Sequence, residues 1–155
     1  MTKIFRRSLL CLLAILAALT VGASPSFAAT SSWTISRLHD VVYASNSSRT
    51  VTFQVPQTSL PASPVITSTI VTVRPYSNGF TDDTIHICFQ RQLEYTDYAC
   101  YPDFKITDLT TVTIPTFNGQ NAKGTVSVRQ TLTGGTYPAT SGGTTQDSVT
   151  VNYQY

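Results

Sequence analysis

Two histidines, His39 and His86, are the side chains best suited to acid–base or metal chemistry in this chain. A zinc site needs three or four ligands, usually at short spacing, and the sequence has neither an HExxH motif nor a cluster of cysteine and histidine. The pair His39-Asp40 would support a serine nucleophile, but no GxSxG elbow is present to supply one. We therefore expect no catalytic residue, no metal and no cofactor.

Asp82 and Asp83 form the one acidic doublet of the chain. Adjacent strand residues point to opposite faces, so the two carboxylates would not share a site as the paired acids of glycosidases do. A turn or strand-entry position is the better interpretation. The same alternation predicts that His86 points away from the apolar side of its strand, and Trp33 is predicted to be a core or lid aromatic.

The first 28 residues have the pattern of a secretory signal peptide. Three basic residues precede an apolar run over 9–19, and small residues at Ser26 and Ala28 mark a cleavage site. The run is short for a membrane-spanning helix, which needs roughly 20 apolar residues, although an uncleaved anchor is the alternative. We expect a periplasmic protein with one domain over 29–155 and no stable membrane insertion.

Cleavage also changes the charge of the chain. Three of the ten basic residues precede the predicted cleavage site and all eight acidic residues follow it, so the mature net charge is about −1. The remaining basic residues are dispersed, and we therefore predict no nucleic-acid partner.

Cys88 and Cys100 are predicted to form a disulfide. Cys11 lies within the leader, which leaves these two as an even pair in a disulfide-permissive compartment. A thiol pair that binds metal or does redox work is the competing interpretation, but the spacing is not that of a CxxC motif. A disulfide that closes this loop should stabilise the fold by roughly 3 kcal/mol on the chain-entropy model.

Alternating apolar and polar residues predict an all-β domain. The alternation indicates strands with one face in the core and one toward water. The predicted strands cover 51–55, 65–73, 85–90, 104–106, 111–114, 126–129 and 149–154. Seven or eight strands without a long helix favour a single antiparallel β-sandwich, immunoglobulin-like in outline, with a small closed barrel as the alternative.

Turn residues separate these strands. Asn78-Gly79 and Asn118-Gly119 are typical of two-residue hairpins, because both residue types tolerate the positive φ of a type I′ turn. Gly134-Gly135 and Gly142-Gly143 indicate looser connections, and three prolines make 56–64 a loop.

The predicted disulfide would clamp a hairpin whose tip is 90–98. This tip carries paired charged and aromatic side chains, at Arg91, Glu94, Tyr95, Asp97 and Tyr98. Such groups on a stapled loop are suited to binding a protein partner. The alternative is a solvated loop whose tyrosines fold back on the sheet.

Four features resemble the flagellar FlhE family of periplasmic proteins. They are the leader with a domain of this size, the central cysteine pair, the stretch Phe-Asn-Gly-Gln-Asn-Ala at 117–122 and the ending Val-Thr-Val-Asn-Tyr at 149–153. The resemblance covers about 65–153. The chain departs from the family in a longer cysteine loop, and in Pro75-Tyr76 where an aromatic such as tryptophan is expected.

This resemblance implies a non-enzymatic accessory protein of flagellar assembly or export, which binds flagellar rod, hook or export components. It also implies that Cys88 and Cys100 form a structural disulfide, and it supplies no catalytic residue. Partners would be held by the loops or by strand addition at an open sheet edge.

Two other functions fit parts of the sequence. The C-terminal segment 149–154 is similar to the last strand of chaperone–usher pilus subunits, although the N-terminal alternation at Trp33 and Ile35 is short for a donor strand. A secreted binding module that inhibits a hydrolase through the 90–98 tip is the third class.

Overall fold

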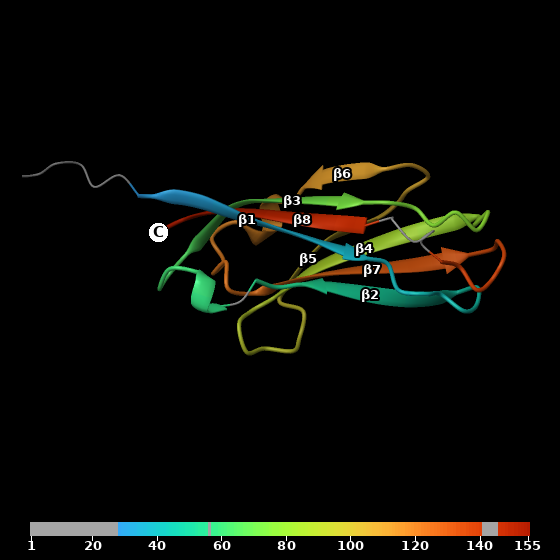
Figure 1. The fold of residues 1–155 in the computed structure, drawn as a ribbon, viewed down its shortest axis with the longest axis horizontal. Coiled ribbons are helices and arrows are strands. Elements are labelled where there is room, and N and C mark those ends of the chain that lie inside the picture. Colours follow the sequence, from blue (N-terminus) through green and yellow to red (C-terminus); the bar gives the residue numbers. More distant parts are fainter. Residues whose placement is uncertain (1–27, 56, 141–145) are drawn as a thin grey trace, which may run out of the picture.

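Two four-stranded antiparallel sheets face each other in the computed structural model (Figure 1). The structure describes residues 28–55, 57–140 and 146–155. Nearly all of the predicted signal peptide and the Gly142-Gly143 connection therefore lie outside the described residues. Within the described part of the chain, no helix is both long and apolar enough to cross a membrane.

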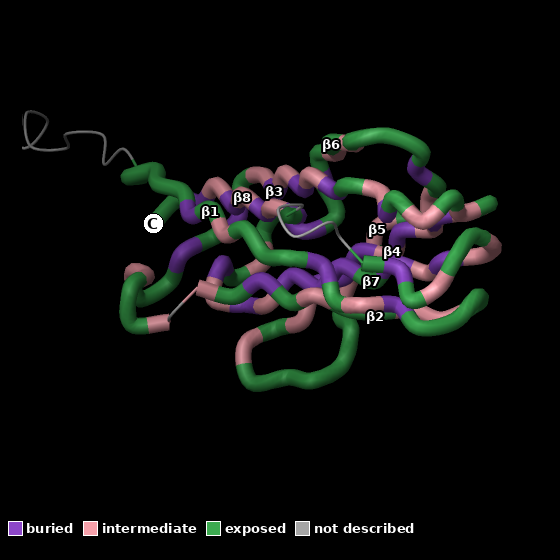
Figure 2. The backbone as a smooth tube through the Cα atoms, turned by 45° about the vertical axis from the view of Figure 1, so that its right-hand side comes forward, coloured by how far each residue is buried: buried purple, intermediate pink, exposed green. Residues whose placement is uncertain are grey.

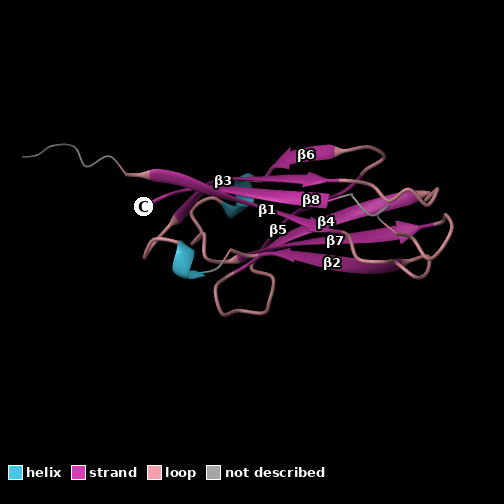
Figure 3. Cartoon of the chain, in the orientation of Figure 1, coloured by secondary structure: helices cyan, strands magenta, loops and turns pink. Residues whose placement is uncertain are grey.

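Strands account for most of the described chain (Figure 3). They are β1 (Thr30–Leu38), β2 (Ser47–Phe53), β3 (Val65–Val73), β4 (Asp82–Gln90), β5 (Ala99–Lys105), β6 (Thr110–Thr113), β7 (Thr125–Thr133) and β8 (Gln146–Gln154). Two short 3-10 helices, η1 (Gln57–Ser59) and η2 (Pro115–Phe117), lie in the connections. Every predicted strand is confirmed, and β1 is added to them. Its alternation is weak because Trp33 is the only buried residue of this edge strand.

The strand order confirms the predicted β-sandwich and specifies its topology. One sheet has the order β1-β8-β3-β6 and the other β2-β7-β4-β5. Successive strands cross from sheet to sheet except at β4–β5, which is the order of an eight-stranded jelly roll made of two Greek keys. An immunoglobulin domain has its first two strands in one sheet, whereas β1 and β2 of this chain lie in different sheets. The sandwich therefore has jelly-roll and not immunoglobulin strand order.

The two Asn-Gly turns do not close hairpins, which corrects the sequence-based prediction. Asn78-Gly79 lies in the β3–β4 connection and Asn118-Gly119 in the β6–β7 connection, and both connections join different sheets. The glycines do have the expected positive φ, at 69° and 82°. Asn118, however, has φ −60° and ψ 142°, which a type I′ turn excludes. Asn-Gly therefore indicates a tight turn without fixing which strands pair.

Buried residues occur along the strands of both sheets (Figure 2), and most of them belong to one hydrophobic cluster. Its largest fully buried side chains include Phe53, Phe89, Phe117, Ile66, Ile85 and Ile87. Trp33, at 8 % exposure, is part of this core, as predicted. A second, smaller cluster consists of Val42, Tyr76, Leu132 and Ala139.

Candidate functional site

The predicted disulfide hairpin is present. Cys88 in β4 lies directly opposite Cys100 in β5, their sulfurs are bonded, and their Cα atoms are 4.1 Å apart. Tyr98 N–H donates to the Phe89 carbonyl at 2.8 Å, which continues the pairing toward the tip. The chain between the two strands therefore leaves a clamped base and forms the large exposed loop at the bottom of Figure 2.

Contacts within the loop give it a defined shape. The Arg91 guanidinium lies over the Tyr98 ring, 3.3 Å from its centroid. Gln90 Nε2 donates to an Asp97 carboxylate oxygen at 3.1 Å, and Glu94 N–H donates to the Arg91 carbonyl at 3.0 Å. Four of the five candidate residues are thus held by neighbours within the loop itself.

The apolar side chains of the tip face solvent. Tyr95 is 93 % exposed and Leu93 is 83 % exposed. Tyr98 is 46 % exposed, because the Arg91 guanidinium covers its ring. Leu93 also has φ +64°, a conformation that costs a residue with a side chain about 1 kcal/mol or more. The tyrosines do not both fold back on the sheet, and Leu93 extends the candidate surface that the sequence predicted.

A groove runs beneath the tip. It encloses about 360 Å³ between the loop and the ends of β2, β4 and β7. The lining side chains are mostly amides, hydroxyls and the loop's own residues: Thr52, Gln54, Gln57, Gln90, Arg91, Leu93, Glu94, Tyr95 and Thr125. Gln92 Nε2 donates to Gln57 Oε1 at 2.5 Å, which ties the tip to η1 at one side of this groove.

His86 is half-buried on the outer face of β4, as its position in the alternation predicts. Its Nε2 lies 2.9 Å from Cys88 Sγ and its Nδ1 lies 2.5 Å from Asp103 Oδ1. His86, both cysteines and Asp97 have their potential ligand atoms within 4.8 Å of one another. Because the two sulfurs are bonded together, this cluster offers no thiolate to a metal in the oxidised protein.

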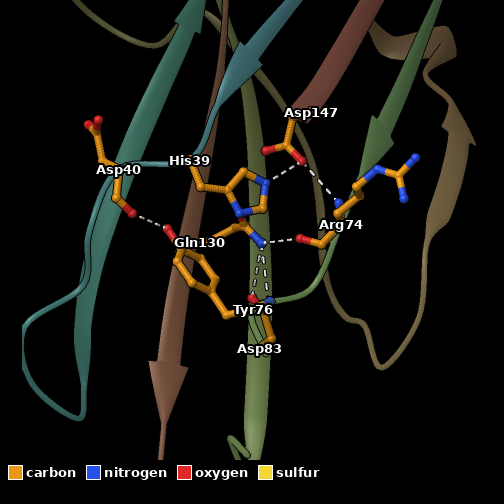
Figure 4. A network of polar contacts seen from close by, with 7 residues as sticks. All are labelled: His39, Asp40, Arg74, Tyr76, Asp83, Gln130 and Asp147. Carbon is orange, nitrogen blue, oxygen red and sulfur yellow. Dashed lines mark hydrogen bonds and ion pairs between the residues drawn. The ribbon is translucent and has the colours of Figure 1, made fainter. Parts of the chain in front are cut away.

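A buried polar network lies at the other end of β4 (Figure 4). Asp147 Oδ1, at the start of β8, accepts hydrogen bonds from His39 Nε2 at 2.7 Å and from Arg74 N–H at 2.9 Å. The side chains of His39 and Asp147 are both fully buried. Asp147 therefore joins the end of β1 to the end of β3 across the first sheet.

Asp83 forms the second half of the network. Its carboxylate accepts from Gln130 Nε2 at 3.2 Å and from Tyr76 N–H at 3.4 Å, and Gln130 Nε2 also donates to the Arg74 carbonyl at 3.0 Å. Burial raises the pKa of the Asp83 carboxyl to about 6, against the lowering effect of its hydrogen bonds and of His39. Burial, with the nearby carboxylates, also raises the pKa of the Tyr76 hydroxyl, which donates to the Asp40 carbonyl.

This arrangement answers the two predictions on acid–base residues. Asp82 and Asp83 do diverge, since Asp82 pairs with Lys105 at 2.8 Å on the exposed face while Asp83 is buried. His39 is oriented by Asp147 and not by Asp40, and its Nδ1 has no hydrogen-bond partner among the described residues. Within the described part of the chain this His–Asp pair is buried, and its contacts hold the ends of β1, β3 and β8 together.

The comparisons with known proteins give a match in structure only. The solved structure of FlhE matches the chain with a TM-score of 0.57 and 16 % identity, over 81 % of this chain and 98 % of that one. The fold is FlhE-like. No protein-family model matches the sequence, and no curated protein does. The turnip yellow mosaic virus structure matches at a TM-score of 0.46 and 14 % identity over 83 % of this chain and 95 % of that one.

The described residues form eight strands, four in each sheet of the FlhE-like sandwich. Its C-terminal strand β8 lies inside the first sheet, paired over most of its length with β1 on one side and β3 on the other. A pilus subunit lacks one strand and receives it from a neighbouring molecule, whereas here the chain's own β1 fills the place beside β8. The condition that would favour a pilus subunit is therefore not met among the described residues.

Proposed function

We propose that the chain is a non-enzymatic accessory protein of flagellar assembly or export that acts in the periplasm by binding a protein partner. The observation that carries this proposal is the likeness to the FlhE structure, which extends over 98 % of that chain. The intact disulfide supports it, because disulfides persist in the periplasm and are rare in the cytosol. The two sequence stretches that resemble the FlhE family add to this support.

We place the partner-binding surface on the loop over 90–98. Protein interfaces are enriched in tyrosine and arginine, and Arg91, Tyr95 and Tyr98 occur together on this loop. Among the described residues, three of the eight exposed large hydrophobic side chains lie between Leu93 and Tyr98. The disulfide and the contacts inside the loop pre-order it, which lowers the entropy lost on binding.

Crosslinking tests the function. The mature protein would be crosslinked mildly in the periplasm of flagellated cells, isolated, and its companions identified by mass spectrometry. Rod, hook or export components among them would support the proposal. A pilus chaperone, or a ladder of copies of the chain itself, would favour the fimbrial alternative, and a hydrolase would favour the inhibitor.

The double variant Tyr95→Ala/Tyr98→Ala tests the surface. We expect it to weaken binding of the captured partner by at least tenfold, because buried aromatic anchors contribute about 2 kcal/mol or more each at the centre of an interface. Titration of the purified partner with each protein measures the effect.

Tyr43→Ala is the matched control. Tyr43 is also an exposed tyrosine beside an arginine, with the Arg49 guanidinium 5.7 Å from its ring centroid, but it precedes β2 and lies outside the loop. It should bind the partner as the unaltered protein does. Equal affinity for all three proteins would exclude the tip as the contact surface.

A further inference from the structure

The two cysteine residues of the disulfide differ in accessibility. Cys88 is fully buried, whereas Cys100, on the edge strand β5, is exposed. Thiol–disulfide exchange begins when a thiolate attacks one sulfur, and access decides which one. Cys100 is therefore the cysteine that faces an incoming thiolate, and attack on it makes the Cys88 sulfur the leaving group.

His86 contacts the sulfur that would leave. Its Nε2 lies 2.9 Å from Cys88 Sγ while its Nδ1 lies 2.5 Å from the Asp103 carboxylate. A bonded disulfide sulfur and a carboxylate are both acceptors, so only the doubly protonated imidazolium donates to both. The hydrogen bond from His86 strengthens as the Cys88 sulfur gains the negative charge of a thiolate. An interaction that is stronger in the transition state than in the ground state lowers the barrier to exchange.

A β-bulge explains why Asp103 is within reach. Ile85 pairs with Phe104 and Ile87 pairs with Tyr101, so two residues of β5 lie opposite His86. Bulges re-aim side chains, and this one brings the Asp103 carboxylate to the imidazole from the neighbouring strand. Asp103 is therefore a positioning residue, which fixes the orientation of the His86 ring as a carboxylate commonly does for a functional histidine.

We propose that Cys88–Cys100 is a thiol–disulfide exchange site for an external thiol, with His86 as the acid that assists departure of Cys88. The thiolate forms a new S–S bond with Cys100 as the Cys88–Cys100 bond breaks. The electron pair of the broken bond goes to Cys88 Sγ, and His86 Nε2 gives it a proton. One disulfide replaces another, so the step consumes no further oxidant or reductant. The partner is a protein or small molecule with an accessible thiol.

Charged groups from three elements surround the imidazole. Asp103 approaches from β5, Asp97 lies within 4.8 Å in the loop, and Arg129 on β7 is the register partner of His86. Because the incoming thiol also meets these charges, an uncharged thiol is the cleanest probe.

The test is the rate of exchange with mercaptoethanol. Folded protein is mixed with the thiol, quenched with iodoacetamide, and analysed by peptide mass spectrometry. We expect a mixed disulfide on Cys100 and an alkylated Cys88. His86→Gln should slow its formation by about tenfold near pH 6, because a weaker acid assists the leaving thiolate. The difference should shrink toward none at pH 9, because an imidazole that has lost its second proton cannot serve as the acid.

Matched variants separate this role from a structural one. Thr84→Ala changes the same outer face of β4 without touching the disulfide and should react at the unaltered rate. Asp103→Asn retains the imidazole and should slow the reaction less than His86→Gln does. If His86→Gln misfolds, Asp103→Asn still tests the proposal. An adduct on Cys88, exchange only after unfolding, or a slowing equal at both pH values would overturn the proposal. These outcomes do not depend on a flagellar role.

Discussion

Replacing Asp147 by alanine is expected to lower the free energy of unfolding by about 3–5 kcal/mol, the usual cost of removing one partner of a buried polar pair. The same oxygen accepts from His39 Nε2 and from the Arg74 N–H, so the substitution leaves one buried donor and one half-buried donor without this acceptor. Each such donor costs about 1–3 kcal/mol. Urea denaturation at neutral pH, followed by tryptophan fluorescence from Trp33, measures the change.

A double-mutant cycle distinguishes the pair from the mere loss of side-chain volume. The free energy of unfolding lost by His39→Ala/Asp147→Ala should be smaller than the sum of the two single losses, with a coupling of about 1–3 kcal/mol. Each single variant leaves the other member of the pair buried without its partner, whereas the double variant removes both members. Asp108→Ala is the control, since Asp108 is exposed between β5 and β6, and it should change stability by less than about 0.5 kcal/mol. Additive single effects would mean that the His39–Asp147 contact contributes nothing specific.

The sandwich could be predicted because period-2 alternation is a local signal. Val149, Val151 and Tyr153 face the core in register, and the intervening polar residues face outward. Strand order is different, because it depends on which of several similar strands meet after the chain has crossed between sheets. Asn78-Gly79 illustrates the limit: the turn forms, but it joins β3 to a strand of the opposite sheet.

The loop over 90–98 and the disulfide that closes it could also be predicted, since Cys88 and Cys100 are close in sequence and lie on adjacent strands. The buried network could not be read from spacing, because its members come from separate elements. A signal for it does exist in the alternation. Asp83 occupies the same face of β4 as Ile85, and Asp147 the same face of β8 as Val149. A carboxylate at a core position predicts a buried partner without saying which residue it is.

Asp83 should make the stability of the protein fall as the pH rises from about 4 to about 7. Burial raises the pKa of this carboxyl to about 6 from an ordinary 3.8, so the folded state binds the proton more tightly than the unfolded chain does. Its contribution is fully present below pH 4 and is lost as the pH passes the folded-state pKa. A shift of this size corresponds to about 3 kcal/mol at most. Urea denaturation at pH 4, 5, 6 and 7 follows the loss.

Asp83→Asn removes the titrating group while preserving an oxygen that can accept from Gln130 or Tyr76. The stability of this variant relative to the unaltered protein should therefore improve by up to about 3 kcal/mol between pH 4 and pH 7. Asp82→Asn, one residue earlier on the exposed face, removes only the surface ion pair with Lys105 and should shift stability by less than about 1 kcal/mol. If the Asp83→Asn and unaltered proteins keep a constant difference across this range, Asp83 ionises in the folded state as it does in the unfolded chain. Its two hydrogen bonds would then offset its burial in full.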